Sequence, residues 1–484
     1  MRILHVASEM YPLAKTGGLG DVVAALPAAQ VARGDAARVL LPGYPAVLSA
    51  LGQSRRITGD PNLFGGGWGQ VLEGRLEGVP FPVYVLECSQ LFWRDGPLYL
   101  GPDGQDWPDN PQRFAALGWA AEQLAAGADS LWQPDIVHGH DWQSGMAFVF
   151  IRHRLPPPRQ PGLVLTIHNL AFQGWFGAEV AGRLGLPPEG FNPGGYEFHG
   201  GVNFLKAGLA YADRITTVSR TYAAEIQTPD QGFGLDGLLR TRQSALRGIV
   251  NGVDYQIWNP ATDPHLPQPY DIGDLAGKAA AKSALQERLG LGRAPWRPLF
   301  ALVGRLTGHK GAHLLLKAIP ALLAAGGQLA VLGTGEKDKE DGFRFAAAAH
   351  PGQVAAVLHF DETLAHLYQA GADVMLLPSL TEPCGLTQLY AMRYGTLPLV
   401  RRVGGLADTV INAEPEAVAA GTATGFSFND PTPEALAGTL VWVADLYRDH
   451  SLWRQIQKTA MTQDFSWEKA AEAYDALYQE LRPA

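Results

Sequence analysis

Several short segments combine glycine with charged residues at the ends of apolar runs, where ligands meet buried sheets. The first reads Lys15-Thr16-Gly17-Gly18-Leu19-Gly20-Asp21. Glycines in such a turn let the backbone approach a ligand, and a helix start offers unpaired N–H groups to phosphate oxygens. A dinucleotide fingerprint would need a small residue where Val23 stands, and Walker spacing fails as well. Lys15 favours a phosphate loop, with a glycine turn that serves only packing as the alternative.

Two further segments in the first half place histidine at the ends of apolar runs. The first contains His138, His140 and Asp141, and the second contains His168 beside Asn169. Because no further ligand set with metal spacing lies nearby, we predict no metal site. Asp141 is expected to bind a sugar hydroxyl, to support a cationic transition state or to cap a helix. His168 would offer directional hydrogen bonds to a hydroxyl-rich ligand, and the aromatic pair Trp175-Phe176 suits a sugar face.

The second half carries a pair of cations and a carboxylate at similar positions. Arg305 and Lys310 stand five residues apart after an apolar run, and a diphosphate is their natural ligand, with two solvated loop cations as the alternative. Glu382 precedes Gly385-Leu386-Thr387, so one turn could hold a sugar hydroxyl and phosphate oxygens. Cys384 is interpreted as a packed residue, since no adjacent base indicates a nucleophile.

Short β-branched runs alternate with helix-period segments twice along the chain, which is typical of two doubly wound α/β domains. The expected strands are 3–7, 38–41, 83–86, 135–138, 163–168, 214–218 and 248–251, then 299–304, 328–332, 354–359, 373–377 and 396–400. We place the domain boundary at about 247–255, before a proline-rich, irregular stretch at 258–269. Such domains bind ligands at the carboxyl ends of their strands and between one another, so a deep interdomain cleft is the expected site.

The last segment, 466–484, has apolar residues at three- and four-residue spacing after Ser466, a plausible N-cap. This pattern predicts an amphipathic helix that needs a partner. The residues leave open whether the helix caps the second domain or returns to the first.

Composition excludes several classes of protein. With 46% hydrophobic and 18% charged residues among 484, the chain is too apolar for disorder, and its 57 glycines and 35 prolines indicate many turns. A net charge of −9 without a basic tail argues against nucleic acid or an anionic membrane as partner. The start MRILHVASEM lacks the features of a secretory signal, and no apolar run of membrane-spanning length occurs. Two cysteines cannot form a disulfide framework, so we expect a soluble, cytoplasmic protein.

Taken together in order, these motifs resemble the bacterial glycogen synthase and plant starch synthase family over about residues 1–480. The segments that carry the resemblance are KTGGLGDVV, HDWQ, IHNLAFQG, FLKAG, NGVD, GRLTGHKG, TEPCGLTQLYAMRYGTLPLVR and GGLADTV. The resemblance implies a GT-B fold with domains 1–247 and 253–463 and a last helix, 466–484, that returns to the first domain. It implies glucose transfer from ADP-glucose to the nonreducing end of an α-1,4-glucan (glycogen), with retention and without a cofactor.

The family's functional residues carry over by position. Lys15, Gly17 and Gly18 match the donor-phosphate loop, and Arg305 with Lys310 matches the pair that neutralises the leaving ADP. Glu382 matches the sugar-binding glutamate, with Gly385, Leu386 and Thr387 at the phosphate. His168 and Asp141 match residues on the glucose side.

The sequence departs from the family at the nucleotide side. Phe360 stands where relatives have an adenine-stacking tyrosine, and Leu380-Thr381 replaces a basic or aromatic pair, so a glucan synthase that prefers UDP-glucose or accepts both donors is the alternative. A phosphorylase, which would need a pyridoxal-phosphate lysine, and a noncatalytic glucan-binding protein are the other classes considered. The sequence does not indicate an oligomeric state.

Overall fold

A nine-stranded sheet organises the first half of the chain in the computed structural model, which describes residues 1–481. Residues 482–484 of the expected C-terminal helix lie outside the described residues. From edge to edge the strands are β12 (Leu246–Gly248), β11 (Arg214–Thr217), β7 (Gly162–Ile167), β6 (Ile136–His140), β1 (Arg2–Val6), β2 (Ala36–Pro42), β5 (Val83–Glu87), β4 (Gly69–Gly74) and β3 (Arg55–Asp60).

The strands of this sheet are parallel except at one edge. The first seven, from β12 to β5, pair in parallel, as the alternation of strand and helix predicts. Strands β3 and β4 were not predicted from the sequence; β4 pairs antiparallel with β5, and β3 pairs antiparallel with β4. Their sequences, RRITGD and GQVLEG, are polar, glycine-containing and only partly buried, which an antiparallel edge tolerates.

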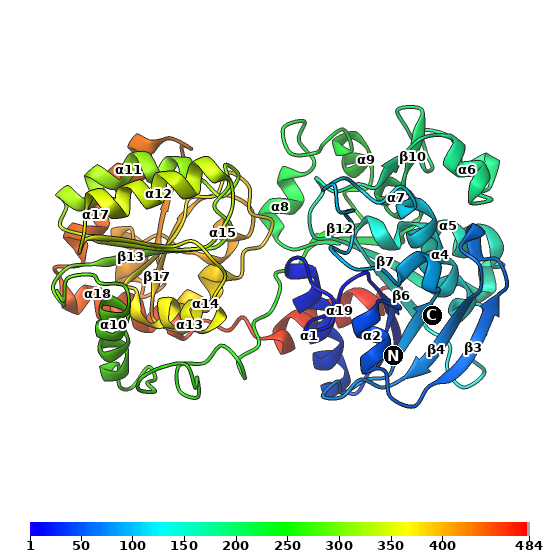
Figure 1. The fold of residues 1–484 in the computed structure, drawn as a ribbon, viewed down its shortest axis with the longest axis horizontal. Coiled ribbons are helices and arrows are strands. Elements are labelled where there is room, and N and C mark those ends of the chain that lie inside the picture. The colour runs from blue at the N-terminus through cyan, green and yellow to red at the C-terminus, as the bar shows by residue number, and fades with distance from the viewer. Residues whose placement is uncertain (482–484) are drawn as a thin grey trace. The chain divides into compact units, whose positions relative to one another are not determined.

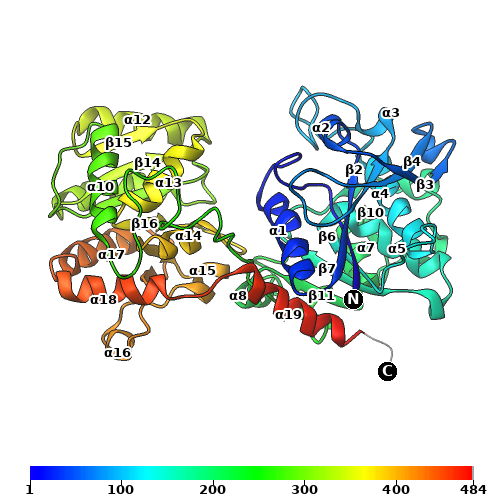
Figure 2. The same ribbon diagram turned by 90° about the horizontal axis from the view of Figure 1, so that it is seen from below.

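Helices cover the parallel part of this sheet, and a small antiparallel sheet stands beside it (Figures 1 and 2). The helices are α1 (Gly18–Ala32), α2 (Pro45–Ala50), α3 (Ser89–Phe92), α4 (Asn110–Ala125), α5 (Gly145–Arg154), α6 (Glu179–Arg183), α7 (Phe204–Tyr211), α8 (Arg220–Glu225) and α9 (Asp236–Thr241). The small sheet is formed by β8 (Trp175–Phe176), β10 (Gly201–Asn203) and β9 (Glu197–Phe198).

The C-terminal helix α19 (Trp467–Gln479) packs beside α1 on one face of the nine-stranded sheet (Figure 2). Its buried side chains join a hydrophobic cluster with Ile3 of β1, Ile136 of β6 and Val164 of β7. The chain accordingly divides into one unit of Met1–Gly252 with the segment from Trp467, and a second unit of Val253–Ser466. Burial of the apolar stripe of α19 therefore completes the core of the first unit.

A six-stranded parallel sheet organises the second unit. Its order is β15 (Val354–Val357), β14 (Gln328–Leu332), β13 (Leu299–Val303), β16 (Val374–Leu377), β17 (Leu397–Arg401) and β18 (Phe426–Phe428). In Figure 1, α11 (Ala312–Ala324), α12 (Lys337–Ala349) and α17 (Pro433–Leu446) lie on one face of it. On the other lie α10 (Ala276–Arg288), α13 (Glu362–Gly371), α14 (Thr387–Arg393) and α18 (His450–Met461). The shorter α15 (Gly404–Thr409) and α16 (Pro415–Ala419) complete the unit.

The proline-rich stretch before α10 is irregular, as its composition predicts. It is fixed to the second unit by Trp258, whose ring stacks between His366 and Tyr390 with centroid distances of 3.9 and 4.0 Å. Asp263 also accepts hydrogen bonds from His366 and Tyr394. Within residues 1–481, no helix is long and apolar enough to cross a membrane.

Candidate functional site

The predicted residues of the first unit gather at the carboxyl edge of its sheet. The chain leaves β1 toward β2 on one side, whereas β6 and β7 lie on the other, so the strand order reverses between β1 and β6. Lys15 and its glycines follow β1, Asp141 follows β6 and His168 follows β7. Ligands of open α/β sheets bind at such a reversal, which makes this edge the candidate site of the first unit.

Glu9, which the sequence analysis missed, organises the glycine loop after β1. Its carboxylate accepts hydrogen bonds from the Thr16 N–H at 2.7 Å, the Thr16 hydroxyl at 2.5 Å, the Gly17 N–H at 3.3 Å and the Tyr99 hydroxyl at 2.6 Å. Lys15 pairs with Asp21, with 2.7 Å between Nζ and Oδ1, and its side chain remains 38% exposed. The Glu9 carboxylate therefore fixes the glycine loop, and the ammonium of Lys15 remains at the surface.

The glycines of this loop differ in what a side chain would meet. A Cβ added at Gly17 or Gly18 has no atom within 4 Å, whereas at Gly20 it would lie 3.3 Å from the side chain of Lys15. Gly17, the N-cap of α1, has an extended φ of −155° that any residue adopts. Packing against Lys15 thus accounts for Gly20, whereas neither packing nor backbone conformation requires glycine at positions 17 and 18, which leaves them open to close approach of a ligand.

Asp141 connects the ends of β6 and β7. Its Oδ1 accepts the His168 N–H at 2.7 Å, and its backbone has a φ of +53°, which is strained for a residue with a side chain. It stands at the N-cap of the short turn Trp142–Ser144, but its side chain makes no capping bond there. Burial, partly opposed by the N–H groups of His168 and Asn169, raises the pKa of Asp141 to about 7. The carboxyl group therefore positions His168.

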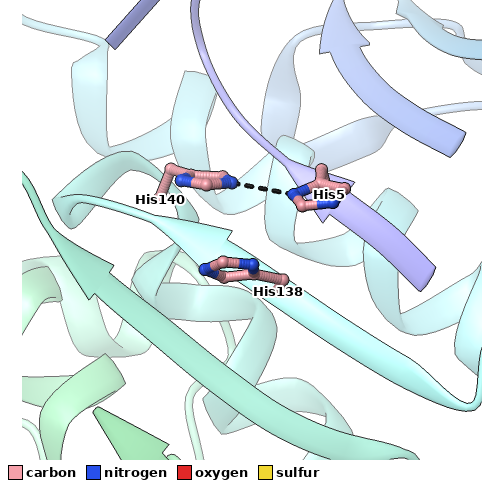
Figure 3. Close-up of side chains that lie close together, drawn as sticks. All are labelled: His5, His138 and His140. Carbon is pink, nitrogen blue, oxygen red and sulfur yellow. Dashed lines mark hydrogen bonds between the residues drawn. The ribbon is translucent and has the colours of Figure 1, made fainter. Parts of the chain in front are cut away.

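Three buried histidines, His5, His138 and His140, lie close together on the face covered by α1 and α19 (Figure 3). Their ligand atoms lie within 4.8 Å of one another, a spacing that could hold a metal ion. However, both ring nitrogens of each histidine already have a hydrogen-bond partner. Because a metal needs a free lone pair from each ring, this hydrogen-bonded arrangement does not fit one. His5 was not predicted from the sequence, where its only signal was a polar residue inside a buried strand.

In the second unit, Lys310 and Glu382 meet across another strand-order reversal, between β13 and β16. The Nζ of Lys310 lies 2.5 Å from Oε2 of Glu382, which also accepts the Ser379 hydroxyl at 3.1 Å. Glu382 is 7% exposed. Arg305 is exposed, and within residues 1–481 no hydrogen bond or ion pair involves its guanidinium. The structure thus brings the predicted carboxylate and one predicted cation together at this edge.

The loops that carry these residues are braced against each other. The Leu380 N–H donates to His309 O at 2.7 Å, and Arg401 donates to Ser379 O and Leu380 O at 2.9 and 2.6 Å. Gly311 has a φ of +73°, and a Cβ there would lie 2.0 Å from Pro378 O, so only glycine permits this contact. The spacing of Lys310 and Glu382 is therefore fixed by backbone contacts.

The remaining predicted residues lie at the same edge. Gly385, with a φ of +73°, and Leu386 precede α14, which begins at Thr387. Cys384 is 6% exposed and not in a disulfide, in agreement with its interpretation as a packed residue. Phe360 follows β15 and is 82% exposed, so its ring is open to a planar ligand.

The loop after β14 was not predicted as part of the site, although its Gly-Thr-Gly signal follows an apolar run. A Cβ at Gly333 would lie 1.8 Å from Gly304 O, and at Gly335 it would lie 2.2 Å from Leu306 O. Glu336 accepts the Gly308 N–H at 3.0 Å. This loop therefore supports the segment that presents Arg305 and Lys310.

Comparisons with known proteins cover the whole chain. Residues 2–241 match the family model of the starch synthase catalytic domain, and residues 288–459 match that of the glycosyl transferases group 1. A glycogen synthase of Acidiphilium cryptum is 50% identical over 485 residues, with 99% of each chain covered. One from Rhodopseudomonas palustris (strain HaA2) is 49% identical, covering 99% of this chain and 98% of the relative.

Solved structures are similar as well. The catalytic domain of starch synthase IV from Arabidopsis thaliana, bound to ADP and acarbose, matches with a TM-score of 0.87 and 33% identity over 99% of both chains. A sucrose-phosphate synthase from Thermosynechococcus elongatus has a TM-score of 0.59 and 19% identity, with 99% of this chain and 98% of that chain covered, and so shares the fold alone.

Proposed function

This chain belongs to the glycogen synthase and starch synthase family, and we propose that it transfers glucose from ADP-glucose to the nonreducing end of an α-1,4-glucan, with retention. It is a glycosyltransferase with the GT-B fold of two Rossmann-like domains. The observation that carries the proposal is the placement of Lys310, Arg305 and Glu382 at the carboxyl edge of β13 and β16. In a chain of net charge −9, two cations at a strand-order reversal suit a diphosphate.

Lys310 and Arg305 supply the charge that the leaving group needs. As the bond between the anomeric carbon and the donor phosphate breaks, negative charge grows on the ADP oxygens, and fixed cations stabilise that charge more than the ground state. The Lys310 ammonium is already oriented by Glu382 at 2.5 Å. A preorganised ammonium costs little reorganisation at the moment of reaction.

Each carboxylate in these loops already has a hydrogen-bond or ion-pair partner, which favours same-face attack over a double displacement. A double displacement would require a free carboxylate nucleophile and a second, acidic carboxyl group. Glu9 holds the glycine loop, Asp141 holds the His168 N–H and Glu382 holds Lys310. We infer that the acceptor hydroxyl attacks from the side on which ADP leaves, and that a phosphate oxygen takes up its proton.

The first unit is proposed to bind the glucosyl group and the glucan. The support is the neutral, half-buried ring of His168 and the unobstructed Gly17 and Gly18. Phe172 and Trp175, which are 62% and 51% exposed after β7, offer apolar surfaces of the kind on which sugar rings pack.

A donor comparison tests the proposal. Purified protein with glycogen and either ADP-glucose or UDP-glucose should release ADP and lengthen the glucan with ADP-glucose. The added units should be removable by an enzyme specific for α-1,4 linkages. A preference for UDP-glucose would reverse the nucleotide assignment, and a protein that binds glycogen but releases no nucleotide from either donor would refute the enzyme assignment.

We also propose a cytoplasmic location. The support is chemical: Cys88 and Cys384 are both buried and not joined in a disulfide, which suits a reducing compartment.

A further inference from the structure

A continuous chain of hydrogen bonds runs from the C-terminal helix to the candidate site. The Tyr478 hydroxyl lies 3.3 Å from Nε2 of Gln30 in α1, and Oε1 of Gln30 lies 2.7 Å from Nε2 of His5. Nδ1 of His5 lies 3.0 Å from Nε2 of His140, as Figure 3 shows, and Nδ1 of His140 lies 3.0 Å from Nε2 of His168.

The histidine rings of this hydrogen-bond chain lie wholly or partly out of water, and burial favours their neutral form. His5 and His140 are fully buried, and His168 is half-buried at the end of β7. Burial lowers the pKa of His5 to about 4 and that of His168 to about 3, and it lowers the pKa of His140 as well. A neutral imidazole has one N–H donor and one acceptor nitrogen, so each ring that donates to its neighbour must accept from the other side. The group at one end of this series of hydrogen bonds therefore sets the donor and acceptor of every bond in the series.

The amide of Gln30 sets that direction. Its carbonyl oxygen faces His5, and its NH₂ group faces the Tyr478 hydroxyl, which is left to donate to Nδ1 of His138 at 2.7 Å. Because the amide oxygen can only accept, Nε2 of His5 carries the proton and Nδ1 of His5 accepts from His140. By the same rule His140 accepts from Nε2 of His168. The proton of His168 is then on Nε2, and its Nδ1 is a lone-pair acceptor.

We propose that Gln30, His5 and His140 are positioning residues that hold His168 in the Nε2–H tautomer, so that its Nδ1 accepts a hydrogen bond from a hydroxyl of the glucosyl group. The last clause rests on the proposed function, whereas the tautomer assignment does not. The Asp141 bond to the His168 N–H fixes the backbone of the same residue, while His140 holds its ring at Nε2. A fixed acceptor distinguishes a hydroxyl from a group that can only accept.

The first test observes the tautomer directly and requires no substrate. In protein labelled with ¹⁵N-histidine, long-range proton–nitrogen correlations distinguish a protonated from an unprotonated ring nitrogen. His168 is assigned by the signal lost in His168→Asn. We expect Nε2 of His168 to be protonated in the wild-type protein, and we expect a population protonated on Nδ1 in Gln30→Met, which has no amide. Protonation on Nδ1 in the wild type, or an unchanged tautomer in Gln30→Met, would overturn the proposal.

The second test separates positioning from general loss of structure. His140→Leu removes the acceptor for the Nε2 proton, whereas the side-chain oxygen of His140→Asn can take the place of Nδ1. We expect kcat for glucosyl transfer to fall about 10-fold or more in His140→Leu, with a smaller change in KM for ADP-glucose, and to recover in part in His140→Asn. Tyr474→Phe is the matched control, because it removes a hydroxyl of α19 that takes no part in the hydrogen bonds from Gln30 to His168.

Equal kcat values for His140→Leu and the wild type, or equal losses in the leucine and asparagine variants, would refute the positioning role. A wild-type protein without any glucosyl transfer would refute the proposed function instead, and it would leave the spectroscopic result unaffected.

Discussion

The ammonium of Lys310 lies 2.5 Å from the carboxylate of Glu382, and the pair joins the loops after β13 and β16. The lysine side chain is 31% exposed and that of the glutamate 9%, so the carboxylate is the buried anchor and the ammonium faces outward. Backbone contacts such as that of Gly311 with Pro378 fix the two loops before any ligand binds. Glu382 is therefore the partner of the cation, and under the proposed function it would also accept a hydrogen bond from a sugar hydroxyl.

Glu382→Gln should lower activity while leaving the protein folded. The amide keeps the size of the side chain but loses the charge that orients Lys310, so we expect kcat/KM to fall about 100-fold. Stability should fall only modestly, because the ammonium of Lys310, which loses its partner, is 31% exposed and can still be hydrated. Initial rates and thermal melts measure both quantities. Glu362→Gln, at the exposed start of α13, is the control, and equal rates in the two variants would contradict the assignment of Glu382.

Gly18→Ala should leave the fold unchanged and impair donor binding. An added Cβ at Gly18 meets no protein atom within 4 Å, so the melting temperature should be retained while KM for ADP-glucose rises. Gly20→Ala is the counterpart, since its Cβ would lie 3.3 Å from Lys15 and its effect should include stability. An unchanged KM for ADP-glucose in Gly18→Ala would contradict a role in donor binding and would favour a glycine turn that serves only packing.

Phe360→Ala should weaken binding of the nucleotide without affecting folding. Stacking of a base on an aromatic ring contributes about 1–3 kcal/mol, which corresponds to about 5- to 150-fold in KM. The ring is 82% exposed, so its removal costs little stability. Phe345, which is 76% exposed on α12 of the same unit, provides the matched Phe345→Ala control. Identical KM values for the two variants would remove Phe360 from the donor site.

Stability should depend on pH through the buried histidines of the first unit. Burial lowers the folded-state pKa of His5 and His168 to about 4 and about 3, and that of His138 and His140 below the ordinary value of 6.5. The unfolded chain therefore binds more protons below about pH 6.5, so stability is complete above this pH and is lost as the pH falls toward the folded values.

Each such histidine contributes a slope of up to about 1.4 kcal/mol per pH unit. Urea unfolding of the wild type and of His138→Gln, measured from about pH 7 to about pH 5, should show a shallower fall in the variant. His138 is chosen because it is not part of the series of hydrogen bonds that links Gln30 to His168. Parallel curves would show that His138 does not titrate on unfolding.

Strand-end motifs were predictable because parallel strands bring their carboxyl ends to one edge, and each motif lies within a few residues of its strand. The sequence thus located Lys15, Asp141 and His168 in one unit and Lys310 and Glu382 in the other. It could not locate Glu9, Gln30 or His5, because their roles depend on neighbours distant in sequence. It also missed β3 and β4, since an antiparallel edge needs no apolar run.

The most direct test of the central assignment is the initial rate of glucosyl transfer from ADP-glucose to glycogen in Arg305→Ala and Lys310→Ala. Lys317→Ala, which removes an exposed lysine from α11, serves as control. If Arg305 and Lys310 stabilise the leaving diphosphate, each substitution should lower kcat about 100- to 1,000-fold with the far-ultraviolet circular dichroism unchanged, and the control should match the wild type. Rates near the wild-type value in both variants would contradict the assignment.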